Sequence, residues 1–201
     1  MTQVAIIDGG GANIASLQFA LERLGCTSVL TSDFDVIERA ERVILPGVGA
    51  ARDAMDKLRA QGLDKKIPEL KIPLLGICLG MQLLFEHSEE DNTACLGILK
   101  GTARRFTPAT GRPVPHMGWN QVSQTKATAL FADIPERSYF YFVHSYAVDK
   151  GAATIGTTDY GDEFTSIASN NNFMGTQFHP ERSGRFGAQL LANFLLIETT
   201  V

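Results

Sequence analysis

The stretch LLGICLGMQLLFE, residues 74–86, is where an apolar run ends in a cysteine between two glycines and a helical pattern begins. Gly76, Cys78 and Gly80 have the spacing G-x-C-x-G, the thiol counterpart of the G-x-S-x-G turn that joins a strand to a helix. Side chains at both glycine positions would clash in so sharp a turn. At the start of a helix, free N–H groups and the dipole favour a thiolate. From these residues alone, Cys78 is either a nucleophile or a small apolar residue packed in a turn.

Around this turn, the first half of the chain alternates strand-like and helical patterns. Such alternation is typical of a parallel sheet covered by helices. We expect helices over 13–24, 50–61 and 79–87. The expected strands are VAIID (4–8), SVLT (28–31), RVILP (42–46) and IPLLGI (72–77).

The second half, from about 97 to 178, has short β-branched and aromatic runs separated by Gly, Pro and Asn. An amphipathic C-terminal helix containing Phe186, Leu190 and Phe194 follows. The chain is therefore predicted to be one domain, 1–201, of α/β class: a flavodoxin-like, mostly parallel mixed sheet flanked by helices, with additional antiparallel strands in the second half. The strands expected in this half are 97–101, 103–106, 120–123, 138–146, 152–158, 165–169 and 173–179.

Composition excludes several classes of function. The 201 residues are 44% hydrophobic and have a net charge of −4 without blocks of Lys or Arg. We therefore expect no binding to nucleic acid or to an anionic membrane. The N-terminus lacks a signal-peptide pattern, and no stretch is long enough to span a membrane, so a cytoplasmic location is predicted.

The cysteines and histidines give no sign of a disulfide framework or a metal site. The three Cys form no CxxC pair, and the four His have no metal-ligand spacing, so no metal is predicted. The glycine-rich DGGGAN (8–13) lacks the sixth-position glycine of a dinucleotide-binding motif, and we set that interpretation aside. We expect no cofactor.

A second stretch with possible chemistry is GTQFHPERS, residues 175–183. A strand is predicted to end at His179, and Glu181 follows two residues later, so the carboxylate and the imidazole can point to the same side. A carboxylate that accepts one ring N–H leaves the other nitrogen free to take a proton from a thiol. The alternative is a surface histidine beside a solvated glutamate.

A third stretch is RVILPGVGA (42–50), in which a strand leads into Gly47-Val48-Gly49. Two glycines allow a backbone N–H to turn toward a neighbouring site, as an oxyanion donor must, although P-G-x-G alone is an ordinary turn. An elbow thiol, a donor loop and a distant His-x-Glu together are the parts needed for acyl transfer. All three follow predicted strands, where open α/β sheets form their sites.

Taken together, PGVG, GICLGMQLLFE and GTQFHPE resemble the motifs of the class I (triad) glutamine amidotransferases and occur in the same order. The resemblance covers almost the whole chain and implies the fold of that family. Within the family, the sequence is most similar to the glutaminase subunits of imidazole glycerol phosphate synthase. The features that point there are PGVGA, VPHMGWN (114–120), YFVHSY (141–146) and a length near 200 residues.

The resemblance implies a catalytic role for each motif residue. The Cys78 thiolate would attack the side-chain amide of L-glutamine, His179 would move the protons and Glu181 would orient His179. Backbone N–H groups of Leu79 and Gly49 would hold the oxyanion. The positions that would bind glutamine are Gly47, Gln82, Glu90, His144, Ser145 and Tyr146.

The resemblance also implies a partner. A (β/α)8 cyclase would form a heterodimer with this chain and accept its ammonia, making imidazole glycerol phosphate and aminoimidazole carboxamide ribonucleotide in histidine biosynthesis. Trp119 and Asn13 are candidate contacts, and simple packing is the alternative for Trp119.

Two departures from the family pattern occur, since 8–13 lacks the usual aromatic residue and Arg182 stands where Lys is common.

Two alternatives remain open from the sequence. The chain could supply ammonia to another acceptor, such as anthranilate or pyridoxal phosphate synthase, or it could be a non-catalytic flavodoxin-like protein with Cys78 as a redox sensor. A redox sensor would not need His179 and Glu181 together. We also expect low activity of the isolated chain, because the Val48-Gly49 peptide can point its carbonyl at the thiol until a partner binds.

Overall fold

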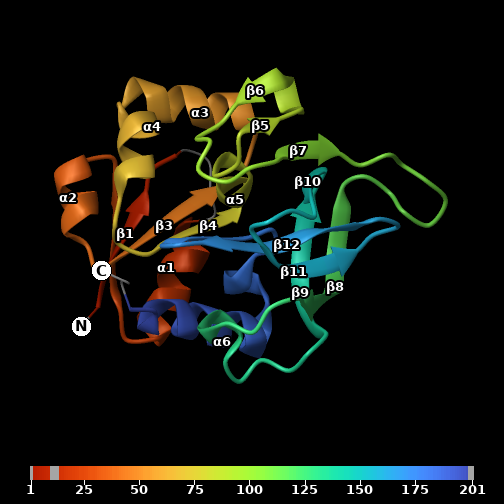
Figure 1. The fold of residues 1–201 in the computed structure, drawn as a ribbon. Coiled ribbons are helices and arrows are strands. Elements are labelled where there is room, and N and C mark those ends of the chain that lie inside the picture. The colour runs from red at the N-terminus through yellow and green to blue at the C-terminus, as the bar shows by residue number, and fades with distance from the viewer. Residues whose placement is uncertain (1, 10–13, 199–201) are drawn as a thin grey trace.

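The computed structural model describes residues 2–9 and 14–198. At its centre lie five parallel strands in the order β2-β1-β3-β4-β13 (Figure 1). β1, β3 and β4 are short and rich in buried aliphatic residues, as expected for strands covered on both faces, whereas no residue of the edge strand β2 is fully buried. Their bounds are β1 (Gln3–Ile7), β2 (Thr27–Thr31), β3 (Arg42–Gly47), β4 (Leu74–Cys78) and β13 (Phe173–Thr176).

Helices cover both faces of these strands. Because side chains of a strand alternate between the faces, Ile6 packs with the core beneath α1 and α6, whereas Ile7 packs with the core beneath α2 and α3. Figure 1 shows the same division, with α1 and α6 on one side and α2, α3 and α4 on the other. The helices are α1 (Ile14–Arg23), α2 (Phe34–Arg39), α3 (Ala51–Ala60), α4 (Leu63–Lys66), α5 (Leu79–Leu83) and α6 (Gly184–Leu196), and the 3-10 turns are Ile67–Glu69, Glu90–Asn92, Ala129–Phe131 and Pro180–Arg182.

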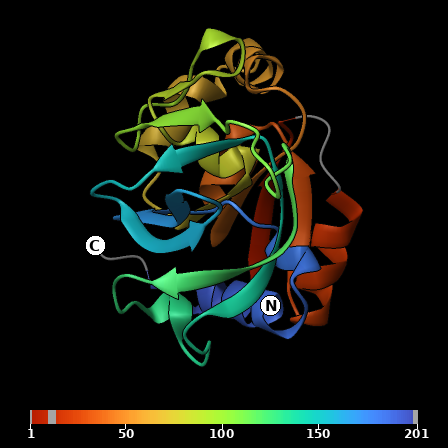
Figure 2. The same ribbon diagram turned by 90° about the vertical axis from the view of Figure 1, so that its right-hand side faces the viewer.

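Beyond β13, the sheet becomes largely antiparallel. β12 pairs antiparallel with β13, and the order continues β12-β10-β7-β5-β6, while β11, β8 and β9 branch from β12 (Figure 2). These strands form the side of the molecule that faces the viewer in Figure 2. Their bounds are β5 (His87–Ser88), β6 (Thr93–Ala94), β7 (Thr102–Arg105), β8 (His116–Gln124), β9 (Ser138–His144), β10 (Tyr146–Asp149), β11 (Thr154–Asp159) and β12 (Glu163–Asn170).

The fold class predicted from the sequence is confirmed, and several local predictions are wrong. No strand forms at 97–101, where Gly97 and Ile98 donate backbone hydrogen bonds to the turn after α5 and close a compact loop. The helix expected over 79–87 ends at Leu83. The strand expected over 138–146 is interrupted at Ser145, which separates β9 from β10. Helices α2 and α4 were not predicted.

Candidate active site

Cys78 lies at the end of β4 and begins α5 with a strained backbone, φ 55° and ψ −112°. The elbow requires its glycines, because a Cβ on Gly76 would lie 2.6 Å from the Gly80 carbonyl oxygen. A Cβ on Gly80 would lie 1.8 Å from the Leu45 carbonyl oxygen. Strain of this kind is typical of functional positions, because packing around the residue must maintain it. The Cys78 side chain is nearly buried, since the residue is 7% exposed.

His179 and Glu181 follow β13, the strand next to β4. Nδ1 of His179 lies 2.8 Å from Oε1 of Glu181, and both side chains are buried. The backbone of His179 is fixed as well, because its N–H donates to Tyr141 and its carbonyl accepts from the Ser183 hydroxyl. Since an ionised carboxylate only accepts, Nδ1 carries hydrogen and Nε2 is the nitrogen that can exchange a proton.

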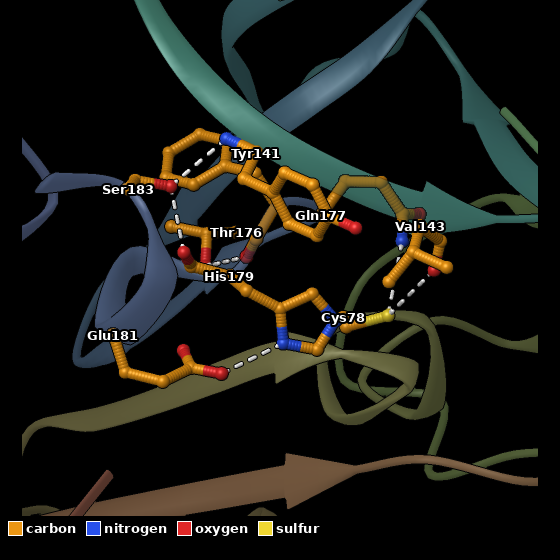
Figure 3. A network of polar contacts seen from close by, with 9 residues as sticks. Cys78, Tyr141, Val143, Thr176, Gln177, His179, Glu181 and Ser183 are labelled. Carbon is orange, nitrogen blue, oxygen red and sulfur yellow. Dashed lines mark hydrogen bonds and ion pairs between the residues drawn. The ribbon is translucent and has the colours of Figure 1, made fainter. Parts of the chain in front are cut away.

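Figure 3 shows the His179 imidazole between the Glu181 carboxylate and the Cys78 sulfur. Burial alone lowers the pKa of His179, but the interactions of the ring with Cys78 and Glu181 outweigh burial and raise it to about 10. Nε2 is buried and has no conventional hydrogen-bond partner among residues 2–9 and 14–198. A protonated imidazole in this position would favour the thiolate form of a neighbouring cysteine.

A cavity of about 340 Å³ opens at this pair, a size suited to a small molecule. The structure brings together in its wall nine of the residues selected from the sequence. Two selected residues are outside the wall. Glu181 contacts Nδ1 of His179 instead, and Gly47 packs beneath the elbow, where a Cβ would lie 2.6 Å from the Gly80 nitrogen. The nine are Gly49, Cys78, Leu79, Gln82, Glu90, His144, Ser145, Tyr146 and His179; Val48, Pro115 and Val143 complete the wall.

Glu90 contributes a carboxyl group to the far side of the cavity. Its Oε2 accepts the backbone N–H of Ala51, the first residue of α3, at 2.8 Å. Burial raises the pKa of Glu90, and the hydrogen bond from Ala51 opposes that effect. A carboxylate in this position can bind the ammonium group of an amino acid.

Sequence reasoning did not identify Gln177 as a functional residue, although it lies within the quoted motif GTQFHPE. The side chain is fully buried and its Nε2 lies 3.8 Å from the Cys78 sulfur. Val143, also missed, places its carbonyl oxygen 3.7 Å from the same sulfur. No local pattern marks either residue, because both contacts join segments far apart in the chain.

His144, in the cavity wall, and His116 form a buried chain of hydrogen bonds. Nδ1 of His144 lies 2.7 Å from the Tyr146 carbonyl and therefore carries hydrogen, so Nε2 must accept from Nδ1 of His116 at 3.0 Å. Nε2 of His116 in turn accepts from the Asn120 amide at 3.3 Å. Burial lowers the pKa of His116 to about 4 and, with smaller contributions from neighbours, that of His144 to about 3. Both rings are neutral at pH 7.

Comparison with known proteins agrees with the fold and the cavity. The family model "Glutamine amidotransferase class-I" matches residues 5–197. The chain belongs to this family, and the enzyme class predicted from the three motifs is confirmed.

The resemblance to a particular branch of the family is confirmed too. The chain is 55% identical to the "Imidazole glycerol phosphate synthase subunit HisH" of Xanthomonas axonopodis pv. citri, covering 97% of this chain and 98% of that protein. It is 53% identical to the protein of the same name from Xylella fastidiosa (strain Temecula1), with the same coverage.

Solved structures support the fold. The PurLQS structure from Thermotoga maritima aligns with a TM-score of 0.72 at 21% identity, covering 96% of this chain and 97% of that one. A crystal structure of a glutamine amidotransferase aligns with a TM-score of 0.73 at 20% identity, covering 96% of each chain. Among the described residues, no helix is long and apolar enough to cross a membrane.

Proposed function

We propose that this chain hydrolyses L-glutamine to glutamate and ammonia at the Cys78 cavity, with Cys78, His179 and Glu181 as the catalytic triad. The observation that carries the proposal is that an elbow cysteine and a carboxylate-bound histidine, about a hundred residues apart, line one cavity. Such a nucleophile, base and orienting group are the requirements of acyl transfer.

The reaction follows from the two ionisable side chains. The Cys78 sulfur attacks the side-chain amide carbon and the carbonyl becomes an oxyanion, which N–H groups of Leu79 and Gly49 hold. The proton on His179 then passes to the departing nitrogen, ammonia leaves and a glutamyl thioester remains. Water, deprotonated by His179, attacks the thioester, the C–S bond breaks and glutamate is released, which restores the thiolate and the protonated imidazole.

The remaining cavity residues suit the amino-acid end of glutamine. The carboxylate of Glu90 pairs with the α-ammonium group, and the backbone at His144, Ser145 and Tyr146 supports the α-carboxylate. These assignments rest on the family resemblance and on the presence of the residues in the cavity wall. Gly47 contributes indirectly, by allowing the β3 end to pack against the elbow.

The ammonia is proposed to pass to a (β/α)8 cyclase subunit that forms imidazole glycerol phosphate and aminoimidazole carboxamide ribonucleotide in histidine biosynthesis. The word "subunit" in the names of the relatives supports a partner. Trp119, Met117 and Tyr139 are 55%, 63% and 53% exposed on neighbouring strands β8 and β9 and form an apolar face suited to docking. Asn13, the other expected contact, lies outside the described residues. The proposed location is the cytoplasm.

Glutaminase turnover tests this proposal when it is measured for the chain alone, with the cyclase, and with the cyclase and its nucleotide substrate. We expect low turnover for the chain alone and strong stimulation by the loaded cyclase. A Cys78→Ala variant that still hydrolysed glutamine in the complex would disprove the nucleophile. Copurification with an anthranilate or pyridoxal phosphate synthase partner in place of the cyclase would reassign the acceptor.

A further inference from the structure

A buried amide contacts the nucleophile from the side away from Glu181. Gln177 follows β13, is 0% exposed, and directs its Nε2 at the Cys78 sulfur, 3.8 Å away (Figure 3). Its Oε1 accepts a hydrogen bond from Nε2 of Gln82 at 2.9 Å. We propose that Gln177 is a further catalytic residue, which stabilises the thiolate form of Cys78 by donating an amide N–H to the sulfur.

The direction of this hydrogen bond is fixed by an atom that cannot reverse its role. The carbonyl oxygen of Tyr146 only accepts, so Gln82 must face it with its Nε2, at 2.9 Å. The same Nε2 donates to Gln177, which must therefore present its oxygen to Gln82. The NH2 group of Gln177 is then left on the side of the sulfur. Exchanging oxygen and nitrogen in either amide would place two donors or two acceptors together.

The sulfur's other polar neighbour shows why such a donor matters. The carbonyl oxygen of Val143, 3.7 Å from the sulfur, can accept the S–H of a thiol but only repels a thiolate. Because Cys78 is 7% exposed, water can do little to solvate the anion. The N–H of Gln177 has the opposite preference to Val143, since a donor binds an anionic sulfur more strongly than a neutral one.

The inference rests on the proposed function only in taking the thiolate as the nucleophile. Ionisation of the thiol can be measured without glutamine, partner or turnover. The failure of one proposal can therefore be distinguished from the failure of the other.

The experiment measures the rate at which iodoacetamide alkylates Cys78 as a function of pH in the full-length chain. Mass spectrometry of the resulting peptides separates Cys78 from Cys26 and Cys95. Gln177→Met removes the donor with little change in volume, and Gln82→Met removes the group that orients it. Thr176→Val is the matched control, because this neighbouring buried hydroxyl donates to Phe178 and not to the sulfur.

For Gln177→Met we expect the midpoint of the pH profile to move upward by about half a unit, which corresponds to a fall of about threefold in the ionisation constant of the thiol. Gln82→Met should move it in the same direction by less, and Thr176→Val should leave it unchanged. A purely structural role would change the rate at every pH and leave the midpoint in place.

A folded Gln177→Met protein with the wild-type midpoint overturns the proposal. If circular dichroism shows that Gln177→Met does not fold, Gln82→Met becomes the deciding variant. An unchanged midpoint in the pH profile of Gln82→Met would then overturn the proposal. A shifted midpoint in a chain without glutaminase activity would support the role of Gln177 and count against the proposed function alone.

Discussion

The His116–His144 pair makes the stability of this protein depend on pH in a direction that the structure specifies. Both rings are buried and neutral, with pKa values lowered to about 4 and about 3 from the usual 6.5. Between pH 6.5 and 4 these two histidines therefore bind more protons in the unfolded chain than in the folded one. Their contribution to stability falls as the pH falls through this window.

The magnitude follows from the lowered pKa values. At pH 5 each unfolded imidazole is 1.5 pH units below the usual pKa of 6.5. At 1.36 kcal/mol per unit, each histidine removes about 2 kcal/mol of stability between pH 7 and pH 5, and the pair removes about 4 kcal/mol. That loss is large against a typical total stability of about 5–15 kcal/mol.

Urea unfolding at pH 7 and pH 5 measures this loss, and His116→Phe isolates it. Phenylalanine can keep the stacking that the His116 ring makes with Tyr160, 4.0 Å between centroids, and with Phe142 at 5.0 Å. The variant should lose about 2 kcal/mol less than wild type between the two pH values, because one titrating group is gone. Its stability should be lower by about 1–3 kcal/mol at both pH values, because Nε2 of His144 loses its donor.

Carboxylates that titrate in the same pH range contribute equally to the stability loss of wild type and variant, so their contribution cancels when the two losses are compared. NMR spectra of histidine-labelled protein at pH 5.5 give a direct check, since both rings should be neutral with hydrogen on Nδ1. An equal loss of stability in wild type and variant, or a protonated imidazole in either ring at pH 5.5, would refute the reasoning.

Three further substitutions test the elbow, the triad and the cavity. Gly80→Ala should destabilise the protein by about 3 kcal/mol or more, because its Cβ would overlap the Leu45 carbonyl, whereas Gly151→Ala, with nothing within 4 Å, should be nearly neutral in thermal unfolding. Glu181→Gln should lower kcat for glutamine by at least about a hundredfold in the activated complex, and unchanged turnover would remove Glu181 from the triad. Glu90→Gln should raise KM by about tenfold with kcat nearly kept, as expected if the carboxylate binds the α-ammonium group; a loss confined to kcat would contradict this role.

The sequence was sufficient for the parallel half of the fold and for the proximity of Cys78, His179 and Glu181, because both depend on local patterns. The strand at 42–46 and the helix at 50–61 are encoded by apolar spacing, and their observed bounds, Arg42–Gly47 and Ala51–Ala60, differ little from the expectation. The elbow is encoded by sterics, since the contacts of Gly76 and Gly80 leave no space for a side chain.

The errors occur where the structure depends on distant contacts. Leu99 is an apolar residue in a strand-like run, yet its N–H pairs with Leu84 in a loop because the turn after α5 offers unpaired carbonyl groups. Helix α2 has six residues and is fixed by its Asp33 cap, so it is too short for helical periodicity to show. The contact between Gln177 and Cys78 spans 99 positions, and no spacing rule reaches so far.

The two halves of the sheet have different parts in the site. The parallel half places the reactive groups, since Cys78 and His179 follow the adjacent strands β4 and β13 at the edge where parallel strands all end. The antiparallel half supplies the wall that surrounds them: Val143, His144 and Tyr146 come from β9 and β10, and the break at Ser145 turns their backbone toward the cavity.

A chain of hydrogen bonds connects the strand that carries the exposed apolar face to the wall of the cavity. Trp119 and Asn120 are consecutive on β8, so their side chains lie on opposite faces of the strand, Trp119 outward and Asn120 toward His116. From His116 the hydrogen bonds continue through His144 to the Tyr146 carbonyl, which also accepts from Gln82. A partner that moved β8 would therefore move groups that orient the cavity. If the proposed cyclase docks on the β8–β9 face, replacing Trp119 by Ala should reduce its stimulation of glutaminase turnover while leaving the turnover of the isolated chain unchanged.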